Sequence, residues 1–359
     1  MKKILIILGT LSMGGGQHMV YELVDNIDKS RFDVTVMCYI GKIGTPLEKK
    51  IEEVANVVYL NENHGITFAS MKHVFAKIRE INPDLIHAHL GGMVYAIPWA
   101  FLNKKKRLMI TAHTEPSQAF HKKVEKLFHW QLKNRKKTTM VVAVSKENHT
   151  ALMNYFSIDH EVCRYINNGI QLKRFYRTKH DYYTFINVAR QDENKNQIAI
   201  LECFNKLYIN NKNIRLLLVG DGSCHSMLVE RAKELGIERV VVFPGMVKDV
   251  ENYYAVSDAY IQSSFVEAMP LSVLEAMAAG LPLISTDVGG MKDVVHENGI
   301  LIPSGDNEAL AAAMETLLLE GEEQRRMREQ KSLELVRNYS SEKMANEYME
   351  LYDELLGVI

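Results

Sequence analysis

The sequence predicts an α/β fold made of two domains, each built on a doubly wound parallel β-sheet. Two observations carry this prediction. Short apolar runs alternate along the chain with segments of helical periodicity, which is the pattern of parallel strands joined by crossover helices. The length of 359 residues also exceeds what a single core normally fills, so two domains of ordinary size are expected.

The composition is that of a soluble globular protein, with 47% apolar and 24% charged residues. The apolar run that follows Met1–Lys3 could belong to a signal peptide. It meets Gly9 and Thr10 without a cleavage site of small residues, so a buried first strand is favoured. No run approaches the ~18 apolar residues of a membrane span. The four cysteines are scattered, which indicates neither a disulfide framework nor a zinc site and favours a cytoplasmic location.

The net charge of −1 conceals two halves of opposite sign. Residues 1–165 contain 23 Lys and Arg against 15 Asp and Glu, whereas the remaining residues contain 20 against 29. The two predicted domains therefore differ electrostatically.

The first half contains alternating strand and helix patterns. Predicted strands are residues 3–8, 32–40, 57–60, 84–90, 107–113 and 140–145, with helices predicted at 17–27, 46–54, 72–81 and 146–156. The strand at 140–145 is expected to end the first sheet. This regular alternation predicts a parallel sheet.

Three glycines, Gly14 to Gly16, lie between the first strand and the first helix. Glycines at this place let the backbone approach a ligand closely, although a flexible loop without a ligand is the alternative. The spacing is not G-x-G-x-x-G, so the dinucleotide-binding fingerprint is not supported.

Three histidines lie at the predicted carboxyl ends of neighbouring strands. His87 and His89 share one face of their strand and could bind a metal, but without a third ligand we favour polar contacts at the strand end. His113 ends the next strand, where ligands bind in parallel sheets. Its alternative role is a capping or core histidine.

The segment 104–137 is strongly basic. It contains 11 Lys and Arg against Glu115 and Glu125, and apolar residues interleave with the lysines: Leu127, Phe128, Trp130 and Leu132. An interfacial helix of this kind can insert its apolar side into lipid headgroups while its cations meet anionic lipid. A solvated basic face is an equal alternative. No nucleic-acid recognition motif accompanies the charge.

A domain boundary is expected between residues 165 and 180. Strands are predicted after it at 185–190, 214–219, 240–245, 259–264, 282–287 and 299–303, with a last helix at 341–356. Arg190 ends the first of these strands and Lys195 follows five positions later. A forked guanidinium and a point charge at the carboxyl end of a strand suit a phosphate ligand.

The segment from Ser263 to Gly290 is the most informative part of the chain. Glu267 precedes Pro270, and proline at the first helical position predicts a helix that runs to Gly280. The free N–H groups of its first turn, around residues 268–272, form an anion site whose natural ligand is a phosphate. Glu275 lies ~7 Å along this helix, so two carboxylates can flank the phosphate. An ordinary amphipathic helix is the alternative.

Glu267 and Glu275 form the pattern Glu-x7-Glu, and the second glutamate lies within the sequence MPLSVLEAMAAGLPLISTDVGG. Together they resemble the motif of retaining glycosyltransferases of family 4, which have the GT-B fold. The resemblance extends over nearly the whole chain. It implies two Rossmann-like domains that face each other across a cleft: residues 1–165 bind the acceptor, residues 166–340 bind a nucleotide-sugar, and residues 341–359 form a helix that crosses back to the first domain.

The resemblance also implies roles for single residues. It implies that Glu267 holds hydroxyl groups of the sugar, that Glu275 holds the ribose, and that His113 contacts the donor hexose. Gln17 stands where many family members have Glu. The expected catalytic residues are Glu267, His113, Arg190 and Lys195. The expected donor-binding residues are Gly15, Gly16, Arg190, Lys195, Met246, Val247, Glu267, Ala268, Met269, Pro270, Leu271 and Glu275.

We therefore expect a hexosyltransferase that moves a sugar from a nucleoside diphosphate-sugar, such as a UDP-sugar, to a glycan or lipid-linked acceptor in surface polysaccharide or glycoconjugate synthesis. Rivals are a nucleotide-sugar epimerase or phosphorylase on the same frame, and a silent scaffold protein on membranes. A glycosidase is disfavoured because donor binding accounts for both glutamates.

No Asp-x-Asp motif is found, so we expect side-chain cations in place of a divalent metal and no further cofactor. Retention of anomeric configuration could use Glu267 as a nucleophile, but the resemblance favours attack on the same face. The expected location is cytoplasmic, with contact to the inner face of a membrane through residues 104–137.

Overall fold

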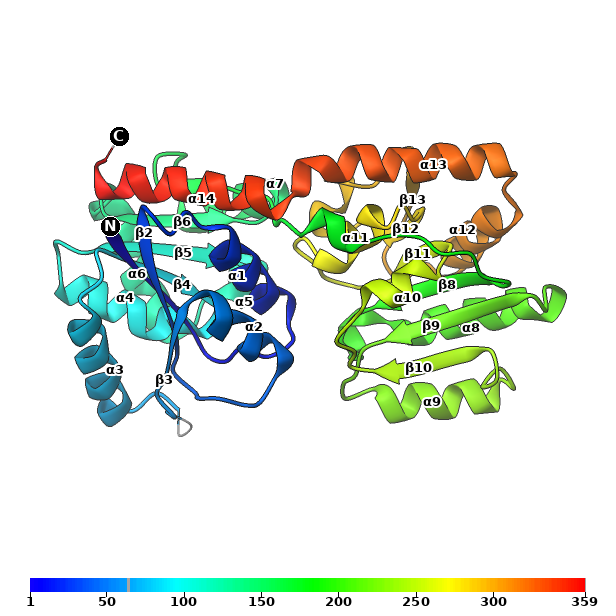
Figure 1. Cartoon of the computed structure of the whole chain (residues 1–359), viewed down its shortest axis with the longest axis horizontal. Helices are drawn as coiled ribbons and strands as arrows, with labels where there is room; N and C mark the ends of the chain where they lie inside the picture. The colour runs from blue at the N-terminus through cyan, green and yellow to red at the C-terminus, as the bar shows by residue number, and fades with distance from the viewer. Residues whose placement is uncertain (63–64, 359) are drawn as a thin grey trace. The chain divides into compact units, whose positions relative to one another are not determined.

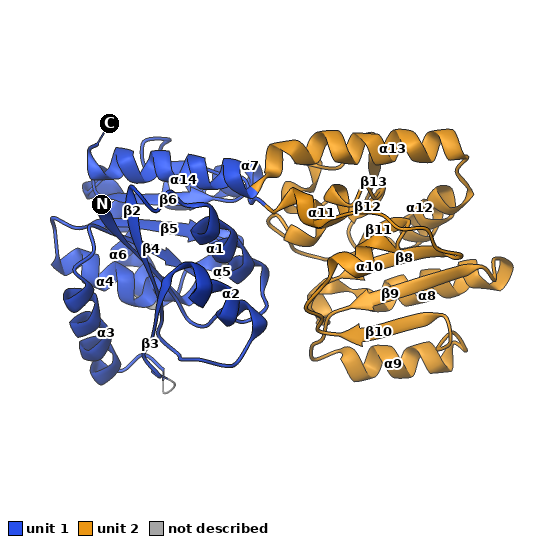
Figure 2. Cartoon of the chain, viewed as in Figure 1, with its two compact units in different colours: residues 1–169, 341–359 blue, residues 170–340 orange. Residues whose placement is uncertain are grey.

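The computed structural model describes residues 1–62 and 65–358. They form two compact units, Met1–Gly169 with Ser341–Ile359 and Ile170–Ser340 (Figure 2). Each unit has one β-sheet whose strand pairs are all parallel, and helices cover both faces of each sheet (Figure 1). The expected α/β fold with two doubly wound parallel sheets is confirmed.

The sheet of unit 1 has the strand order β3-β2-β1-β4-β5-β6-β7. Its strands are β1 Lys2–Leu8, β2 Phe32–Cys38, β3 Asn56–Tyr59, β4 Leu85–His89, β5 Arg107–Ala112, β6 Thr139–Ala143 and β7 Cys163–Tyr165. The expectation that the strand at 140–145 ends this sheet is wrong, because β7 pairs with β6 beyond it. Only Cys163 of the three residues of β7 is buried, so the strand has no apolar run to reveal it.

The helices of unit 1 follow the predicted alternation. They are α1 Gly15–Asn26, α2 Pro46–Val54, α3 Phe68–Ile81, η1 Leu90–Gly92, α4 Met93–Leu102, α5 Pro116–Ala119, α6 Lys122–Asn134, α7 Lys146–Phe156 and α14 Ser341–Leu356. Helix α3 begins before the predicted Lys72, because Thr67 and Ser70 form a capping box that starts it at Phe68.

The alternation of side chains along β4 gives the sheet of unit 1 two different faces. Ile86 and Ala88 belong to the apolar core beneath α4 and α6, whereas His87 points to the opposite face. There its imidazole contacts Tyr352 of α14. Other contacts between α14 and the rest of unit 1 include the Arg31–Asp353 ion pair and the hydrogen bond from Arg107 Nε to the Leu355 carbonyl oxygen.

Helix α6 packs its apolar stripe into the core of unit 1. Val124, Phe128 and Leu132 recur every four residues and are buried there, and Leu127 packs against the same core. Of the apolar residues of α6 that the structure describes, Trp130 alone is exposed, at 46% of its surface. The expectation that this helix inserts an apolar side into a membrane is therefore wrong, because that side is occupied by the protein's own core.

The sheet of unit 2 has the strand order β10-β9-β8-β11-β12-β13. Its strands are β8 Tyr183–Val188, β9 Ile214–Val219, β10 Val241–Gly245, β11 Ala259–Gln262, β12 Leu283–Thr286 and β13 Gly299–Ile302. All six correspond to predicted strands. Because the strands are parallel, the loops that follow β8 and β11 leave the sheet at the same edge, and β8 and β11 are hydrogen-bonded neighbours.

The helices of unit 2 enclose a second apolar core. They are η2 Leu172–Arg174, η3 Glu193–Lys195, α8 Gln197–Asn210, α9 His225–Glu234, α10 Glu251–Ala255, α11 Leu271–Ala278, η4 Gly289–Asp293, α12 Asn307–Leu319, α13 Glu322–Leu335 and η5 Val336–Tyr339. Among the helices of residues 1–62 and 65–358, none has both the length and the apolarity needed to cross a bilayer.

Candidate active site

The loop after β8 presents Arg190 and Lys195 at the carboxyl edge of the sheet in unit 2. Asp192 caps the short η3 turn by accepting a hydrogen bond from the Lys195 backbone N–H at 3.3 Å. Asn196 then ends the turn in a left-handed conformation, with φ of 51°. The local sequence thus fixes the backbone from which the Lys195 side chain extends.

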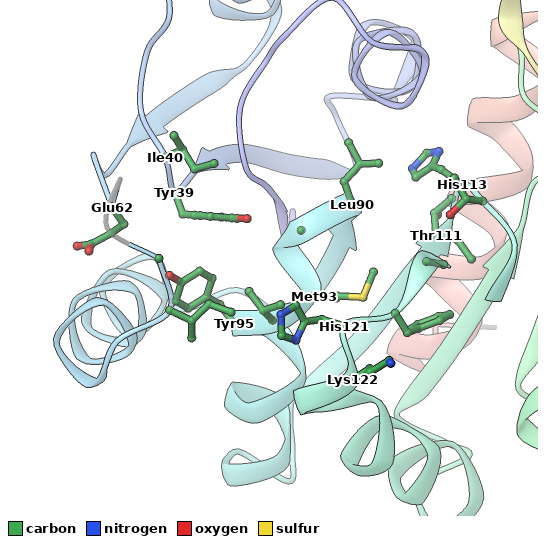
Figure 3. A pocket seen from close by; sticks show the side chains of 18 residues that line it. Tyr39, Ile40, Glu62, Leu90, Met93, Tyr95, Thr111, His113, His121 and Lys122 are labelled. Carbon is green, nitrogen blue, oxygen red and sulfur yellow. The ribbon is translucent and has the colours of Figure 1, made fainter. Parts of the chain in front are cut away.

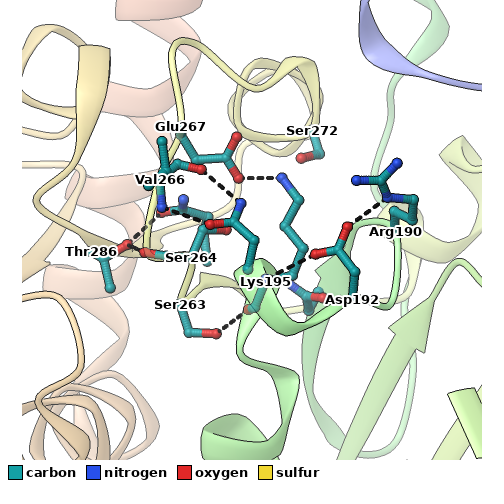
Figure 4. Close-up of polar contacts among 12 residues, drawn as sticks. Arg190, Asp192, Lys195, Ser263, Ser264, Val266, Glu267, Ser272 and Thr286 are labelled. Atoms are coloured by element: carbon teal, nitrogen blue, oxygen red, sulfur yellow. Dashed lines mark hydrogen bonds and ion pairs between the residues drawn. The ribbon is translucent and has the colours of Figure 1, made fainter. Parts of the chain in front are cut away.

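Asn194 fastens this loop to the loop that follows β11. Its side chain donates to the Val266 carbonyl oxygen at 2.9 Å and accepts from the Val266 N–H at 3.0 Å. The Ser263 hydroxyl donates to the Lys195 carbonyl oxygen at 2.9 Å. Figure 4 shows these contacts holding the two loops side by side. The position of Lys195 is therefore set relative to Glu267, which comes next along the chain after Val266.

Lys195 and Glu267 form an ion pair. The distance from Lys195 Nζ to Glu267 Oε1 is 2.5 Å, and the two side chains are only 19% and 11% exposed (Figure 4). Arg190 is different, because 77% of its side chain is exposed while its Nε donates to Asp192 Oδ2 at 2.6 Å. An anion that enters here can reach Arg190 directly, whereas Lys195 must first release Glu267.

Helix α11 begins beside this ion pair with an N-terminus that has no side-chain cap. Pro270 is the N-cap residue, so the helix starts at Leu271, one residue later than predicted. The first N–H groups of a helix have no partner within it, and together they attract anions. The helix ends at Ala278 with Ala279 as its C-cap, and Gly280 beyond it has a φ of 71° that allows the Leu281 N–H to bond the Ala276 carbonyl oxygen at 2.9 Å.

Two glycines support the backbone that carries Glu267. The Gly290 N–H donates to the Ala268 carbonyl oxygen at 2.7 Å. A Cβ atom on Gly289 would lie 2.2 Å from the Glu267 carbonyl oxygen, and its φ of 54° is also unfavourable for other residues. Glycine at position 289 therefore allows this backbone to approach the Glu267 carbonyl oxygen more closely than any residue with a Cβ atom could.

Glu275 lies in the middle of α11 and is half-buried. Its Oε2 accepts a hydrogen bond from the Tyr254 hydroxyl at 3.0 Å, and the same hydroxyl lies 3.0 Å from the Ser272 carbonyl oxygen. Burial raises the pKa of Glu275, while Arg174 and the Tyr254 hydrogen bond lower it in part. One carboxylate oxygen is thus fixed by Tyr254, which orients the other.

Met246 and Val247 follow the carboxyl end of β10. Gly245 ends that strand with φ of 72°, and its carbonyl oxygen accepts from the Gly220 N–H at 2.9 Å. The side chain of Met246 is exposed at this edge. By contrast, the side chains of three predicted site residues are buried: Ala268, Met269 and Leu271. These three can offer a ligand only their backbone.

Two family models cover most of the chain. The model described as glycosyl transferases group 1 matches residues 170–333, which contain all of the groups described above. The model described as Glycosyltransferase Family 4 matches residues 13–174. The chain belongs to the group 1, family 4 glycosyltransferases. The predicted GT-B fold is therefore confirmed together with the family.

The matches between this chain and its curated relatives differ in length. It is 31% identical over 188 residues to N-acetyl-alpha-D-glucosaminyl L-malate synthase of Bacillus anthracis, a match that spans 52% of this chain and 49% of the relative. The chain thus spans about half the length of that relative. It is 25% identical over 331 residues, 89% of each protein, to the GalNAc-alpha-(1->4)-GalNAc-alpha-(1->3)-diNAcBac-PP-undecaprenol alpha-1,4-N-acetyl-D-galactosaminyltransferase of Campylobacter jejuni.

Among solved structures, Anabaena Alr3699/HepE in complex with UDP-glucose is similar to the glycosyltransferase with a TM-score of 0.83. The identity is 18%, and the match covers 98% of this chain and 100% of that one. This likeness supports the fold.

Unit 1 of the glycosyltransferase holds the remaining predicted residues. Gly15 and Gly16 are the first residues of α1 rather than part of a loop, because Gly14 is the N-cap. A Cβ atom on Gly16 would lie 3.4 Å from His113 Nδ1. His113 therefore faces the N-terminus of α1, and burial lowers its pKa to about 4.

A pocket of about 850 Å³ opens next to His113 within unit 1 (Figure 3). Its walls are largely apolar and aromatic: Tyr39, Met93, Val94, Tyr95 and Phe120. Tyr39 and Tyr95 meet edge to face with ring centroids 4.9 Å apart. His121 and Lys122 also line the pocket and provide polar groups. Sequence reasoning missed this pocket, because its walls come from segments far apart in the chain.

Sequence reasoning also missed the residues that orient the predicted ones. Asn194 and Tyr254 belong to no recognised motif. Their hydrogen-bond partners, Val266 and Glu275, lie 72 and 21 positions away in the sequence. The three histidines do meet, since His89 Nδ1 lies 3.0 Å from His113 Nε2. Within the described ranges, no group of three His, Cys, Asp or Glu side chains is arranged to hold a metal ion.

Proposed function

We propose that this glycosyltransferase transfers a hexose from a UDP-sugar to a lipid-linked or glycan acceptor, with retention of configuration and without a divalent metal. The proposal places the donor diphosphate at the N-terminus of α11, between Arg190 and Lys195. The sugar hydroxyls would bind Glu267 and the ribose would bind Glu275.

The observation that carries this proposal is the Lys195–Glu267 ion pair beside the uncapped N-terminus of α11. Either member alone would be an unbalanced charge in a largely buried site. A nucleotide-sugar supplies a partner for each, because its phosphates can take Lys195 while its hydroxyl groups can take Glu267. The substrate thus exchanges one set of charge-assisted hydrogen bonds for another, and no charge is left buried and unpaired.

The departing diphosphate needs its growing negative charge stabilised. Arg190, Lys195 and the first N–H groups of α11 would supply this stabilisation from fixed positions, where such groups act most strongly. These cations would take the part that a divalent metal plays in other transferases. In this mechanism Glu267 holds the sugar and forms no covalent bond, while the leaving phosphate accepts the proton of the acceptor hydroxyl on the same face.

We place the acceptor in the pocket of unit 1 beside His113. The half-buried ring of Tyr39 offers apolar surface to the face of a sugar ring, and the exposed Lys122 suits a nearby phosphate. The Campylobacter relative acts, by its name, on a diphosphate-linked undecaprenol glycan. An acceptor of this chemical type fits a pocket with aromatic walls and a cation.

Contact with an anionic membrane is also proposed, by charge rather than by insertion of α6. Leu102 at the end of α4 and Trp130 on α6 are exposed, and Arg135 lies over the Trp130 ring. The same basic segment, residues 104–137, contains further exposed lysines: Lys104, Lys105, Lys126, Lys133 and Lys137. Lys133→Glu should reduce co-sedimentation with phosphatidylglycerol vesicles relative to Lys206→Glu, the same charge change at an exposed lysine of unit 2. Equal sedimentation of both variants would contradict the membrane proposal.

The proposed reaction is tested by incubating the protein with UDP-sugars, with and without an undecaprenyl diphosphate-linked N-acetylhexosamine. We expect release of UDP that depends on the acceptor, and a product whose anomeric configuration, read by NMR, equals that of the donor. A nucleotide-sugar epimerase would convert the donor without releasing UDP, and a phosphorylase would require inorganic phosphate. A scaffold protein would bind UDP without turnover. Any of these three results would overturn the proposal.

A further inference from the structure

Three histidines gather in unit 1 at the carboxyl ends of β4 and β5. His87 and His89 lie on the same face of β4 and are completely buried, with ring centroids 4.0 Å apart. His113 follows β5 and lies next to His89, with ring centroids 5.2 Å apart. The proposed function assigns no role to His89.

His87 uses both of its ring nitrogens to hold α14 on the sheet. Its Nδ1 lies 2.7 Å from the Tyr352 hydroxyl, and its Nε2 lies 2.8 Å from Thr111 Oγ1. Thr111 Oγ1 is in turn 3.0 Å from the Tyr348 hydroxyl. Every partner of His87 is a hydroxyl that can donate or accept, so His87 does not determine the proton positions of its neighbours.

The two ring nitrogens of His89, unlike those of His87, have different surroundings. Its Nδ1 lies 3.0 Å from His113 Nε2, so one of these two nitrogens must donate to the other. Its Nε2 is buried and has no hydrogen-bond partner among residues 1–62 and 65–358. Burial lowers the pKa of His89 well below its usual value and that of His113 to about 4, so both rings are neutral near pH 7. Each ring then has one N–H group and one bare nitrogen.

Two arrangements of the protons are therefore available. If His113 Nε2 donates, His89 must carry its proton on Nε2, where a buried N–H group would have no acceptor. If His89 Nδ1 donates, only a bare lone pair remains at His89 Nε2. Buried N–H groups without an acceptor are rarer in proteins than incompletely satisfied acceptors. The second arrangement is therefore the favoured one.

We infer that His89 is a positioning residue whose Nδ1–H group holds His113 in the tautomer that carries its proton on Nδ1. That nitrogen faces Gly16 at the N-terminus of α1, where a Cβ atom would lie 3.4 Å from it. The inference rests on the proposed function, which places the acceptor in the pocket of unit 1 beside His113. His113 would then present a neutral hydrogen-bond donor to a sugar oxygen, and glycine at position 16 would leave that donor uncovered.

The tautomer is measured directly by two-bond ¹H–¹⁵N correlation NMR on protein labelled with ¹⁵N-histidine. The signals of His113 are identified by their loss in His113→Gln. We expect a protonated Nδ1 and an unprotonated Nε2 on His113 in the wild-type protein near pH 7. A protonated Nε2 on His113 would overturn the inference, whatever the enzymatic activity of the preparation.

Two substitutions of His89 separate positioning from packing. His89→Asn places an amide N–H near the position of the imidazole Nδ1–H, whereas His89→Leu fills the space without a donor. We expect His89→Asn to keep the Nδ1 tautomer of His113 and most of the transfer activity. His89→Leu should show mixed tautomers and a kcat/KM about tenfold lower.

Equal tautomer populations in the two His89 variants would contradict the positioning role. If His89→Leu fails to fold, the spectra of the wild type and of His89→Asn still decide the question. If no UDP-sugar is turned over, the proposed function fails, but the tautomer result stands by itself. The two failures are therefore distinguishable.

Discussion

Replacing Lys195 by Met removes the cation from the ion pair with Glu267 and leaves the carboxylate, 11% exposed, without its partner. At 2.5 Å the attraction between the two charges is roughly 7 kcal/mol for an effective dielectric constant of about 20, before the cost of removing both from water. Substitutions that leave one member of such a pair unbalanced cost roughly 3–5 kcal/mol. We expect the melting temperature of unit 2 to fall by roughly 6–20 °C.

The same substitution should also impair transfer, for a different reason. If Lys195 stabilises the departing diphosphate, its loss removes one fixed donor to the transition state, which typically costs roughly 100- to 1,000-fold in kcat. A second substitution, Glu267→Gln, distinguishes the two effects. In the double variant no charge is left unpaired, so most of the lost melting temperature should return. Activity should not return, because both substrate contacts are then missing.

The assay combines thermal unfolding with initial rates of acceptor-dependent UDP release for the wild type, both single variants and the double variant. The reasoning requires that stability recovers in the double variant while kcat stays at or below that of the weaker single variant. If activity recovers together with stability, the ion pair serves the fold alone. The assignment of Lys195 to the leaving group would then be refuted.

Three further predictions concern Gly289, Glu275 and His113. Gly289→Ala should weaken UDP binding in calorimetry at least tenfold, because its Cβ would displace the Glu267 carbonyl oxygen. The control is Gly280→Ala, at a similar positive φ but with its nearest neighbour at 3.5 Å, and this variant should bind UDP normally. Equal binding of UDP by the two variants would contradict the role of the close approach at Gly289. Because burial raises the pKa of Glu275 above its unfolded value, its contribution to stability is complete at low pH and is lost as pH rises through the folded pKa. Glu275→Gln should therefore raise the melting temperature at pH 7 but not at pH 4, and weaken UDP binding about tenfold; unchanged binding would exclude a contact with the nucleotide. The pKa of His113 is lowered to about 4, so its share of stability is present above about pH 6.5 and is lost as pH falls toward 4. The urea midpoint of His113→Gln should decline less steeply over that interval, and an unchanged slope would contradict the low pKa.

Much of the fold was predictable because buried parallel strands are continuous apolar runs. KILIIL in β1 and IRLLLV in β9 are examples: each run lies wholly within its strand, and all of its residues except Lys3 and Arg215 are buried. Strand β7 was not predictable in this way, since two of its three residues are only half-buried. Its pairing with β6 is a tertiary interaction that leaves no local pattern.

The basic helix α6 shows how a pattern can be misread. Charge and interleaved apolar residues indicated a membrane-facing helix, and the exposure of Trp130 agrees with part of that interpretation. However, Val124, Phe128 and Leu132 recur at four-residue spacing, which is the pattern of a helix that packs on a core. This periodicity was present in the sequence and outweighs the composition.

The candidate site was predictable as a set of residues but not as a set of contacts. Glu267, Pro270 and the following glycines belong to one contiguous segment, so the motif identifies them together. The pairing of Lys195 with Glu267 joins residues 72 positions apart. The contact between His89 and His113 likewise depends on the register of β4 against β5. Such contacts follow from the order of strands in a sheet, which no local spacing encodes.

A crystal structure of the protein with UDP bound tests the central claim most directly. We predict that oxygens of the β-phosphate lie at hydrogen-bond distance, about 2.7–3.2 Å, from Lys195 Nζ and from the N–H groups at the start of α11. Lys195 would then have left Glu267. A diphosphate bound elsewhere, with the Lys195–Glu267 pair unchanged, would contradict the account.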